Sequence, residues 1–356
     1  MNPTITLTTF LRRLPKSELH CHVVGTLRPE TLAALARKHG IALPRAEHVL
    51  YQYRGFHDFI EVFRLASRVL VDADDFARVA YEYIESAHRD ANLRHIELFF
   101  NPSYHYPYGV SYATQLDGLL EGLRAARKDF GVSGLLIPSI DREFGLDVAH
   151  QVMDDVLARR ADEVVGIGLD GPEDRGPPAQ FAPIFERAGK AGLRRTAHVC
   201  EDYAPIPASN YLVCKDVLGC DRLDHGYRML ADPEVVRRAA FDGITFTCCP
   251  KPSTRERDAL RIGAIRGMLD AGIAISLATD DPLMFDTDLC ECYQRAFTAL
   301  NWDVSRVRAI ALAGVDASWL YPIAKASLRV EFEREIDTLA SQCIQSTRLP
   351  PEKGTS

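Results

Sequence analysis

The chain has 356 residues, of which 47% are hydrophobic, and it carries a formal net charge of −7. This length suits one large domain or two ordinary ones, and the hydrophobic fraction is enough for a sizeable core. The acidic balance argues against a nucleic-acid-binding protein, and no apolar run is long enough to cross a bilayer. The nine cysteines include no Cys-x-x-Cys pair and the N-terminus shows no signal-peptide pattern, so we expect a reduced protein in the cytoplasm.

Eight short apolar or β-branched runs alternate, for the most part, with stretches of helical periodicity. The runs are Glu18–Gly25, His95–Pro102, Val132–Asp141, Val164–Gly171, Arg194–Glu201, Cys220–Tyr227, Ile244–Pro250 and Ala274–Pro282. Eight alternating units in a chain of this size predict a parallel sheet closed into a (β/α)₈, or TIM, barrel. An open doubly wound sheet is the alternative fold, but no Gly-x-Gly-x-x-Gly follows the first run.

The helical stretches lie between these runs and after the last one. They are Asp75–Arg89, Ser111–Lys128, Leu146–Arg160, Pro177–Ala191, Ala208–Leu218, Pro233–Phe241, Ile262–Ala271, Ser305–Ala313 and Ala317–Phe332, with Glu333–Cys343 as a continuation of the last. The connection after the first run, residues 26–94, is long enough to hold several helices, and extra structure there would cover the barrel mouth. We expect one domain over residues 1–344 and a frayed tail over 345–356, and the sequence does not define the oligomeric state.

The first run contains a His-x-His pattern formed by His20 and His22. Because side chains alternate between the two faces of a strand, both imidazoles point to the same side. Two imidazoles at a strand end can share one metal ion, although the pattern also fits a pair of strand histidines that make ordinary hydrogen bonds. A metal site needs further ligands, which directs attention to the other strand ends.

Residues that can bind a metal or move a proton gather at the ends of three later runs. They are His198 and Glu201, then Asp224 and His225, then Asp280 and Asp281. Each has an ordinary alternative as a core histidine, a solvated carboxylate, an ion pair or a helix N-cap. In a parallel barrel, however, all of these strand ends meet at one face. Three imidazoles and one carboxylate suit Zn²⁺, with a further position for water, so we assign to one zinc ion per chain the ligands His20, His22, His198 and Asp280.

Four motifs together resemble the adenosine/adenine deaminase family of the amidohydrolase superfamily. They are LPKSELHCH at 14–22, HVCE at 198–201, DHGY at 224–227 and SLATDDP at 276–282. The motifs follow the family's order, and the resemblance covers nearly the whole chain. It implies a zinc-dependent hydrolytic deaminase of a 6-aminopurine, which replaces the C6 amine by oxygen and releases ammonia or an amine.

The resemblance also implies the roles of individual residues. Glu201 matches the glutamate that protonates purine N1 as water attacks C6, and His225 matches the histidine that orients this water. Asp281 matches a residue that contacts N7, Gly171 matches a glycine whose backbone faces N3, and we place His22 with them against the substrate. Attack at C6 builds negative charge on the ring, so the carboxyl of Glu201 must be protonated when substrate is bound.

Four residues depart from the family's pattern in ways that bear on the substrate. Val24 stands where adenosine deaminases carry an aspartate that contacts the ribose, and an apolar side chain cannot accept that hydrogen bond. Phe99 resembles the adenine deaminase branch, Gly171 resembles the nucleoside branch, and Val199 and Cys200 are large enough to reshape the pocket. Besides adenosine, the candidate substrates are therefore free adenine, an N6-substituted adenine and a modified adenine nucleoside or nucleotide.

Two further groups of residues bear on the same choice. Phe56, Phe59 and Phe63, at helical spacing in the long first connection, line either an apolar substrate site or only the core of that segment. Arg142 and Arg175, near strand ends, are the candidates for contact with a phosphate. Two other classes of protein remain as alternatives, namely a non-catalytic purine-binding relative and another single-metal hydrolase built on the same barrel.

Overall fold

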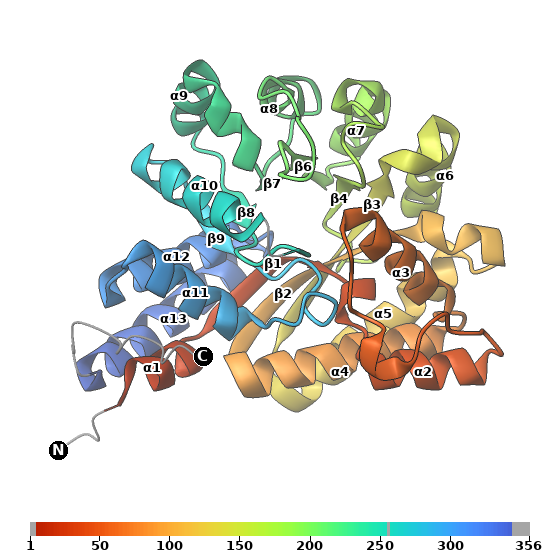
Figure 1. The fold of residues 1–356 in the computed structure, drawn as a ribbon, viewed down its shortest axis with the longest axis horizontal. Helices are drawn as coiled ribbons and strands as arrows, with labels where there is room; N and C mark the ends of the chain where they lie inside the picture. Colours follow the sequence, from red (N-terminus) through yellow and green to blue (C-terminus); the bar gives the residue numbers. More distant parts are fainter. Residues whose placement is uncertain (1–4, 255–256, 344–356) are drawn as a thin grey trace.

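Parallel strands form the centre of the computed structural model, which describes residues 5–254 and 257–343, and helices surround them (Figure 1). The strands are β1 (Lys16–His22), β2 (Leu93–Phe100), β3 (Ser133–Asp141), β4 (Gly166–Asp170), β5 (Arg194–Arg195), β6 (His198–Val199), β7 (Leu223–His225), β8 (Phe246–Cys248) and β9 (Ile275–Leu277). Each strand overlaps one of the eight predicted runs, and β5 and β6 both belong to the fifth run. The expected tail at 345–356 lies outside the described residues.

The strands close into a barrel, although their regular pairing falls into two groups, β1 to β5 and β6 to β9. Between the groups, Thr196 donates back to β4 and Ala197 accepts from β7, so the fifth run bridges them. At the other seam the His22 N–H donates to the Asp280 carbonyl at 2.9 Å, and the Asp280 N–H donates to the His20 carbonyl at 3.1 Å. The predicted (β/α)₈ barrel is therefore confirmed.

The helices follow the predicted alternation with two additions. They are α1 (Leu7–Arg13), α2 (Pro29–Lys38), α3 (Phe56–Arg68), α4 (Ala73–Ala91), α5 (Tyr112–Phe130), α6 (Gly145–Ala158), α7 (Ala182–Lys190), α8 (Asn210–Leu212), α9 (Pro233–Asp242), α10 (Asp258–Asp270), α11 (Leu289–Leu300), α12 (Val304–Ala317) and α13 (Pro322–Gln342). Helices α1 and α11 were not predicted, whereas α13 confirms that the last helix continues past residue 333. Across the described residues, no helix is long and apolar enough to cross a membrane.

Helix α4 shows how the long first connection returns to the barrel. It begins with a capping box in which Asp72 and Asp75 each accept a hydrogen bond from the other's backbone N–H. Its buried face includes Phe76 and Val79, and it ends at Asn92, whose φ of 54° lies in the left-handed region. Strand β2 starts at the next residue, so the helix end sets where the second strand enters the sheet.

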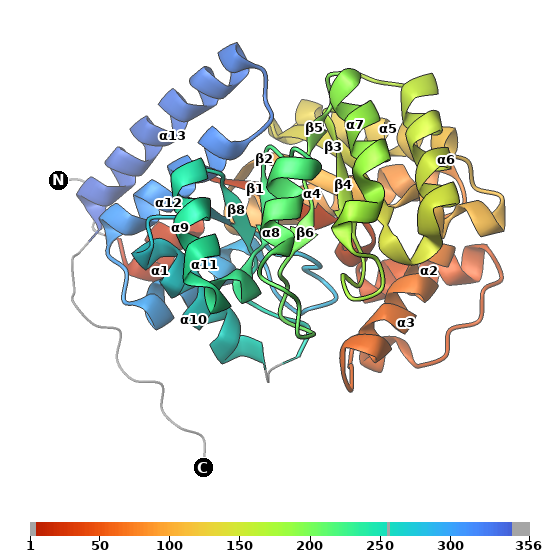
Figure 2. The ribbon, with the colours of Figure 1, turned by 90° about the horizontal axis from the view of Figure 1, so that it is seen from above.

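The same connection also carries α2 and α3, which lie together at one side of the barrel (Figure 2). Phe59 and Phe63 of α3 are buried, and their rings stand 5.9 Å apart. Phe59 also packs at 5.0 Å against Phe285, which follows the last strand. The predicted extra structure after β1 is therefore confirmed, and it joins the loop after β9 at the carboxyl ends of the strands.

Buried charges are paired within the protein near the opposite, amino ends of the strands. The Lys16 ammonium group donates to three main-chain carbonyls at 2.6–2.9 Å. Arg222 donates to Glu97 at 2.7 Å, and its guanidinium lies 4.2 Å from the ring centroid of Trp319. The other carboxylate oxygen of Glu97 accepts from His95 and from the Trp319 backbone. These charges stabilise the barrel only as pairs, because an unpaired buried charge is costly.

Candidate metal and catalytic site

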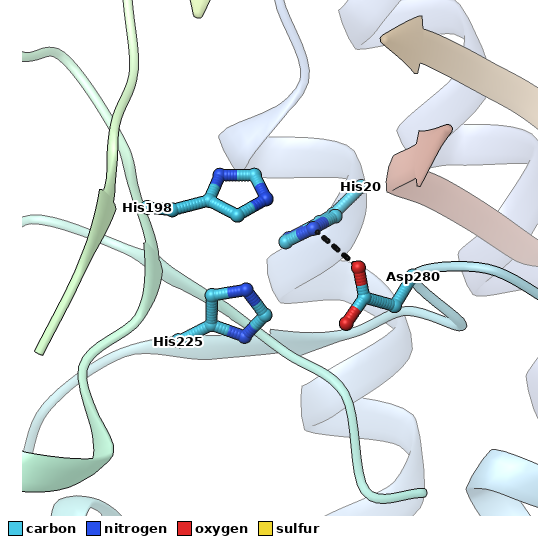
Figure 3. A group of neighbouring side chains, drawn as sticks. All are labelled: His20, His198, His225 and Asp280. Atoms are coloured by element: carbon cyan, nitrogen blue, oxygen red, sulfur yellow. Dashed lines mark ion pairs between the residues drawn. The ribbon is translucent and has the colours of Figure 1, made fainter. Parts of the chain in front are cut away.

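The strand ends bring histidines and carboxylates together at the carboxyl face of the barrel. Figure 3 shows His20, His198, His225 and Asp280 pointing towards one another from β1, β6, β7 and the loop after β9. One ligand atom from each of these four buried residues lies within 4.8 Å of the others. His22 borders the group, with its Nε2 at 3.2 Å from Nε2 of His198 and 3.6 Å from Oδ1 of Asp280. The structure therefore brings together all four predicted metal ligands and the predicted catalytic His225.

The distances within this cluster fit a single zinc ion. Two ligand atoms that each lie about 2.0–2.1 Å from a tetrahedral zinc are about 3.3 Å from each other. The His22–His198 separation is 3.2 Å, and Nε2 of His20 lies 3.2 Å from Oδ1 of Asp280. Within residues 5–254 and 257–343, no hydrogen-bond partner is found for Nε2 of His20 or for either ring nitrogen of His225, and all three atoms are buried. Such atoms need a partner, and a metal ion can supply one to those that ligate it.

Asp224 fixes the orientation of two histidines from behind. Nδ1 of His20 lies 2.9 Å from the Thr247 hydroxyl, which donates to Asp224 at 2.7 Å. Nδ1 of His198 lies 3.3 Å from the other carboxylate oxygen, which also accepts from Thr196 at 2.8 Å. Because the Nδ1 atoms are engaged there, Nε2 of each ring faces the cluster. The sequence analysis noted Asp224 at a strand end without giving it a role.

The ionisation of the cluster favours a bound cation. Burial lowers the pKa of His22 and His198, so these imidazoles are neutral, which is the form that ligates metals. Burial also acts to lower the pKa of His20, but Asp280 and Asp224 outweigh it and raise this pKa. For Asp224, burial acts to raise the pKa, but the hydrogen bond with His198 and the charge of His20 outweigh it and hold the pKa far below its usual value. The cluster thus holds ionised carboxylates that attract positive charge.

A cavity with about 570 Å³ of empty space opens onto the cluster. Its lining residues are His22, Phe56, Phe59, Ile60, Phe63, Asn101, Tyr104, Asp141, Asp170, Gly171, His198, Glu201, His225, Ser253, Arg257, Arg261, Asp280, Asp281 and Phe285. Every predicted site residue except His20 lines the cavity, and His20 lies directly beside it in the cluster.

Glu201 sits three residues after His198, beyond a turn at Cys200 whose φ is 50°. Its side chain is 12% exposed, and Oε1 lies 3.2 Å from Arg261 and 4.0 Å from Nε2 of His225. Burial raises the pKa of Glu201 to about 8, against the opposing charge of Arg261. The carboxyl is therefore mainly protonated near neutral pH, as the role of proton donor requires.

Two glycines allow acidic side chains to approach the cavity. A Cβ on Gly25 would lie 2.1 Å from Oδ1 of Asp281, so only glycine leaves room for this carboxyl. Oδ1 of Asp281 is buried and has no hydrogen-bond partner in the described chain. A Cβ on Gly171, whose φ is 77°, would lie 2.6 Å from Oδ1 of Asp141. The predicted substrate contacts Gly171 and Asp281 are thus held in place by close packing.

The sequence analysis missed two carboxylates on the cavity wall. Asp170 ends β4 and accepts from the Asn101 amide at 2.8 Å on both oxygens. Asp141 ends β3 and accepts from the Glu143 N–H at 2.7 Å and from the Tyr104 hydroxyl. Both lie at strand ends, so the reasoning that found His198 and Asp280 could also have found them.

The four residues that depart from the family's pattern lie outside this set of lining residues. Val24 is buried in a 3₁₀ turn that directly follows β1, so the prediction that it faces the substrate sugar is not supported. Phe99 packs at 5.2 Å against both His20 and His22, beneath the cluster. Val199 and Cys200 are buried, and the Cys200 thiol points to a main-chain carbonyl.

A parallel barrel with histidines and a carboxylate at the carboxyl ends of its strands defines a metal-dependent hydrolase of the amidohydrolase type. The family model described as adenosine deaminase matches residues 15–334. The chain therefore belongs to the adenosine deaminase family, whose enzymes hydrolyse C–N bonds of cyclic amidines, and the resemblance inferred from the motifs is confirmed.

Three known proteins place the chain within this family. Adenine deaminase of Cupriavidus necator is 34% identical over 333 residues, which cover 92% of each chain. The structure of an amidohydrolase from Burkholderia ambifaria with bound zinc is 36% identical, covers 96% of both chains and has a TM-score of 0.87. The structure of an Arabidopsis N6-mAMP deaminase is 25% identical, covers 92% of this chain and 99% of its own, and has a TM-score of 0.79.

Proposed function

We propose that the chain hydrolytically deaminates free adenine or an N6-substituted adenine, and not a nucleotide. The observation that carries the proposal is the acidic wall formed by Asp141 and Asp170 at the cavity. Burial raises the pKa of Asp170 to about 7 and that of Asp141 to about 6, so the pair retains negative charge near neutral pH. Carboxylates repel a phosphate, whereas they accept a hydrogen bond from a ring N–H such as that of a free purine base.

Among the residues that the structure describes, the arginines at the cavity are already paired with protein groups. Arg257 and Arg261 both donate to Asp202, at 2.9 Å and 3.0–3.1 Å. Arg142 is buried and donates to two main-chain carbonyls, at 2.9 and 2.6 Å. Arg175 is exposed and pairs with a glutamate outside the lining set. The phosphate contacts predicted for Arg142 and Arg175 are therefore not supported.

Part of the cavity lining is aromatic. Phe59, Phe63 and Phe285 form a connected group, with ring centroids 5.0–5.9 Å apart along it. Phe56 stacks on Tyr203 with centroids 4.7 Å apart and planes 5° from parallel. Such a wall suits the flat face of a purine and an apolar substituent on its exocyclic nitrogen.

The proposed metal ligands are His20, His22, His198 and Asp280, whose geometry fits one zinc ion. When bound there, zinc supplies the charge that makes water a nucleophile near neutral pH. Of the remaining residues, His225 belongs to the cluster and is proposed to orient the attacking water. Burial lowers the pKa of His225, so its imidazole is neutral.

The other side chains are proposed to hold and protonate the purine. Glu201 transfers its proton to N1 while water attacks C6, which removes negative charge from the ring. Asp281, whose pKa is raised by burial and by Asp280, keeps a proton that it can donate to N7. The Gly171 backbone faces N3. These contacts define a 6-aminopurine by its nitrogen pattern and require nothing at N9.

Release of ammonia or amine by the zinc-loaded enzyme tests the proposal. The panel contains adenine, N6-methyladenine, N6-isopentenyladenine, adenosine and AMP at matched concentrations. We expect kcat/KM for the best base to exceed that for AMP by at least about 10-fold, the effect of one unfavourable charge contact. A higher kcat/KM for AMP than for every base would contradict the proposal.

A matched variant links the result to the acidic wall. Asp141→Asn removes a charge while it keeps the shape of the side chain. This change should raise the ratio of AMP turnover to adenine turnover, and an unchanged ratio would show that the Asp141 charge does not select against phosphate.

A further inference from the structure

Arg261 is a buried arginine in direct contact with the proposed proton donor. It lies in the first turns of α10, is 1% exposed, and its Nη2 stands 3.2 Å from Oε1 of Glu201. Among the described residues, it is the side chain that donates a hydrogen bond to Glu201. The family comparison and the motifs assign no role to this residue.

The guanidinium is fixed in place without help from Glu201. Asp202 accepts a hydrogen bond from Nε of Arg261 at 3.0 Å and from Nη2 at 3.1 Å, so the two side chains form a bidentate ion pair. Nη1 donates to the main-chain carbonyl of Cys249 at 3.2 Å, and the ring of Tyr227 lies 5.1 Å from the guanidinium carbon. This charge is therefore pre-organised before any substrate binds.

The contact defines which oxygen of Glu201 carries the proton. An arginine side chain has only donors and stays ionised in proteins. Oε1 must therefore act as the acceptor in the contact with Arg261, so a neutral Glu201 carboxyl carries its proton on Oε2. Glu201 lines the cavity, and Oε2 is the oxygen left for the substrate.

We propose that Arg261 is a positioning residue for proton transfer, which reserves Oε2 of Glu201 for the substrate and stabilises the carboxylate left after transfer. This inference rests on the proposed function. The proton moves from Oε2 to purine N1, where it stays in the 6-oxo product. The consumed water supplies one proton that restores Glu201 and one that completes the released ammonia.

The interaction is stronger after proton transfer than before it. In the ground state Arg261 faces a neutral carboxyl oxygen, and once N1 is protonated it faces a carboxylate. Only interactions that strengthen towards the transition state accelerate the chemical step. Loss of Arg261 should therefore lower kcat and leave KM nearly unchanged.

A double-mutant cycle with Glu201 tests the proposal on the zinc-loaded enzyme. Arg261→Met should lower kcat for adenine by about 10- to 100-fold, the range of a hydrogen bond to a charged group, with KM changed by less than about 3-fold. In the Glu201→Gln background the same change should cause no further loss, because no carboxylate forms there. Asp202 keeps its bond to Arg257 in these variants, which limits the structural damage.

Two further variants distinguish a positioning role of Arg261 from a general effect on folding. Arg266→Met, on the exposed side of the same helix, should retain the wild-type kcat, and every variant should retain one zinc per chain. Arg261→Lys should recover at least about 3-fold in kcat over Arg261→Met, because it restores the charge without the bidentate geometry.

Three outcomes would overturn the inference. They are a wild-type kcat for Arg261→Met, an equal loss in both backgrounds, and equal losses for the Lys and Met variants. If the rate of Glu201→Gln falls below detection, the comparison of kcat between Arg261→Lys and Arg261→Met tests the inference by itself. Failure of the wild-type enzyme to deaminate any 6-aminopurine would instead overturn the proposed function.

Discussion

The two ends of the barrel treat buried polar groups in opposite ways. Near the amino ends of the strands, both carboxylate oxygens of Glu97 have donors and the Lys16 ammonium has three acceptors. At the carboxyl ends, Nε2 of His20, both ring nitrogens of His225 and Oδ1 of Asp281 are buried without a hydrogen-bond partner among the described residues. Burial is similar at the two ends, so the difference lies in whether the protein itself supplies the partner.

This contrast separates groups kept for stability from groups kept for chemistry. Leaving a buried polar atom without a partner costs about 1–3 kcal/mol, so a fold retains such atoms where a ligand completes them. The charged groups of Lys16 and Glu97 find their partners within the polypeptide. The carboxyl end becomes complete only with a metal ion and a substrate, and each prediction below changes one side of this contrast.

The largest expected effect follows from removing a metal ligand. Asp280→Ala should abolish both zinc binding and deamination, because the variant loses the carboxylate of the cluster. Zinc per chain, measured by elemental analysis, and ammonia release check this outcome. Asp72→Asn is the matched control in the partly exposed group His39, Asp72 and Asp75, and it should keep a full zinc content. Full zinc in Asp280→Ala would refute the ligand assignment.

Glu201→Gln should leave zinc bound and lower kcat by about 10²- to 10⁴-fold, the usual contribution of a general acid. The amide keeps the shape of the side chain but has no proton to transfer. Steady-state kinetics with adenine, alongside a zinc assay, provide the measurement. A rate close to that of the wild type would mean that another group protonates N1.

Arg222→Met tests the buried ion pair with Glu97 near the amino ends of the strands. It leaves Glu97 buried without its charge partner, which should reduce the free energy of unfolding by about 3–5 kcal/mol. The kcat of the folded fraction should stay at the wild-type value, because Arg222 lies outside the cavity lining. Urea unfolding and activity at low temperature test the two statements, and a selective loss of kcat would break the contrast between the ends.

The pH profile should report the proton on Glu201. Burial raises its pKa to about 8, and the active form is the protonated one. The value of kcat/KM should therefore fall as pH rises through this pKa. A bound cation nearby lowers the pKa of Glu201 and moves this falling limb of the pH profile to lower pH. The limb should disappear in Glu201→Gln, whereas a kcat/KM that rises steadily between pH 7 and 9 would exclude a protonated donor.

The smallest effect is expected for Val24→Thr. The change places a hydroxyl of nearly the same size where adenosine deaminases carry a sugar-binding acid. Because Val24 is not among the cavity-lining residues, the preference for adenine over adenosine should change by less than about 2-fold. A larger shift towards adenosine would show that Val24 reaches the sugar after all.

The sequence predicted the parts of the site that depend on strand periodicity. His20 and His22 are two residues apart on one strand and therefore share a face. Asp280 follows the end of another strand, so the barrel topology alone places the three residues together. Arg261 could not be predicted in this way because it comes from a helix, where the spacing does not show which turn reaches a strand end. The position of Val24 relative to the substrate, inferred from the family's motif, stays a prediction, and the structure places this residue in a buried 3₁₀ turn after β1.

Tertiary contacts also explain two differences between the predicted and the observed helices and strands. The short fifth strand was predicted as one run and is split in the structure, with Thr196 and Ala197 bonding to neighbours on either side. Helix α11 follows a loop that was considered only for its Asp280 and Asp281 motif, so its own periodicity was missed. In both cases the approximate position was correct and the exact hydrogen-bonding pattern depended on tertiary contacts.

The seam of the barrel has a consequence for biosynthesis. Asp280 both offers its carboxylate to the cluster and joins the last strand to the first through its backbone. Because translation proceeds from the N-terminus, His20 and His22 emerge from the ribosome long before Asp280 does. The full set of four proposed ligands is therefore present only once the final strand has been made.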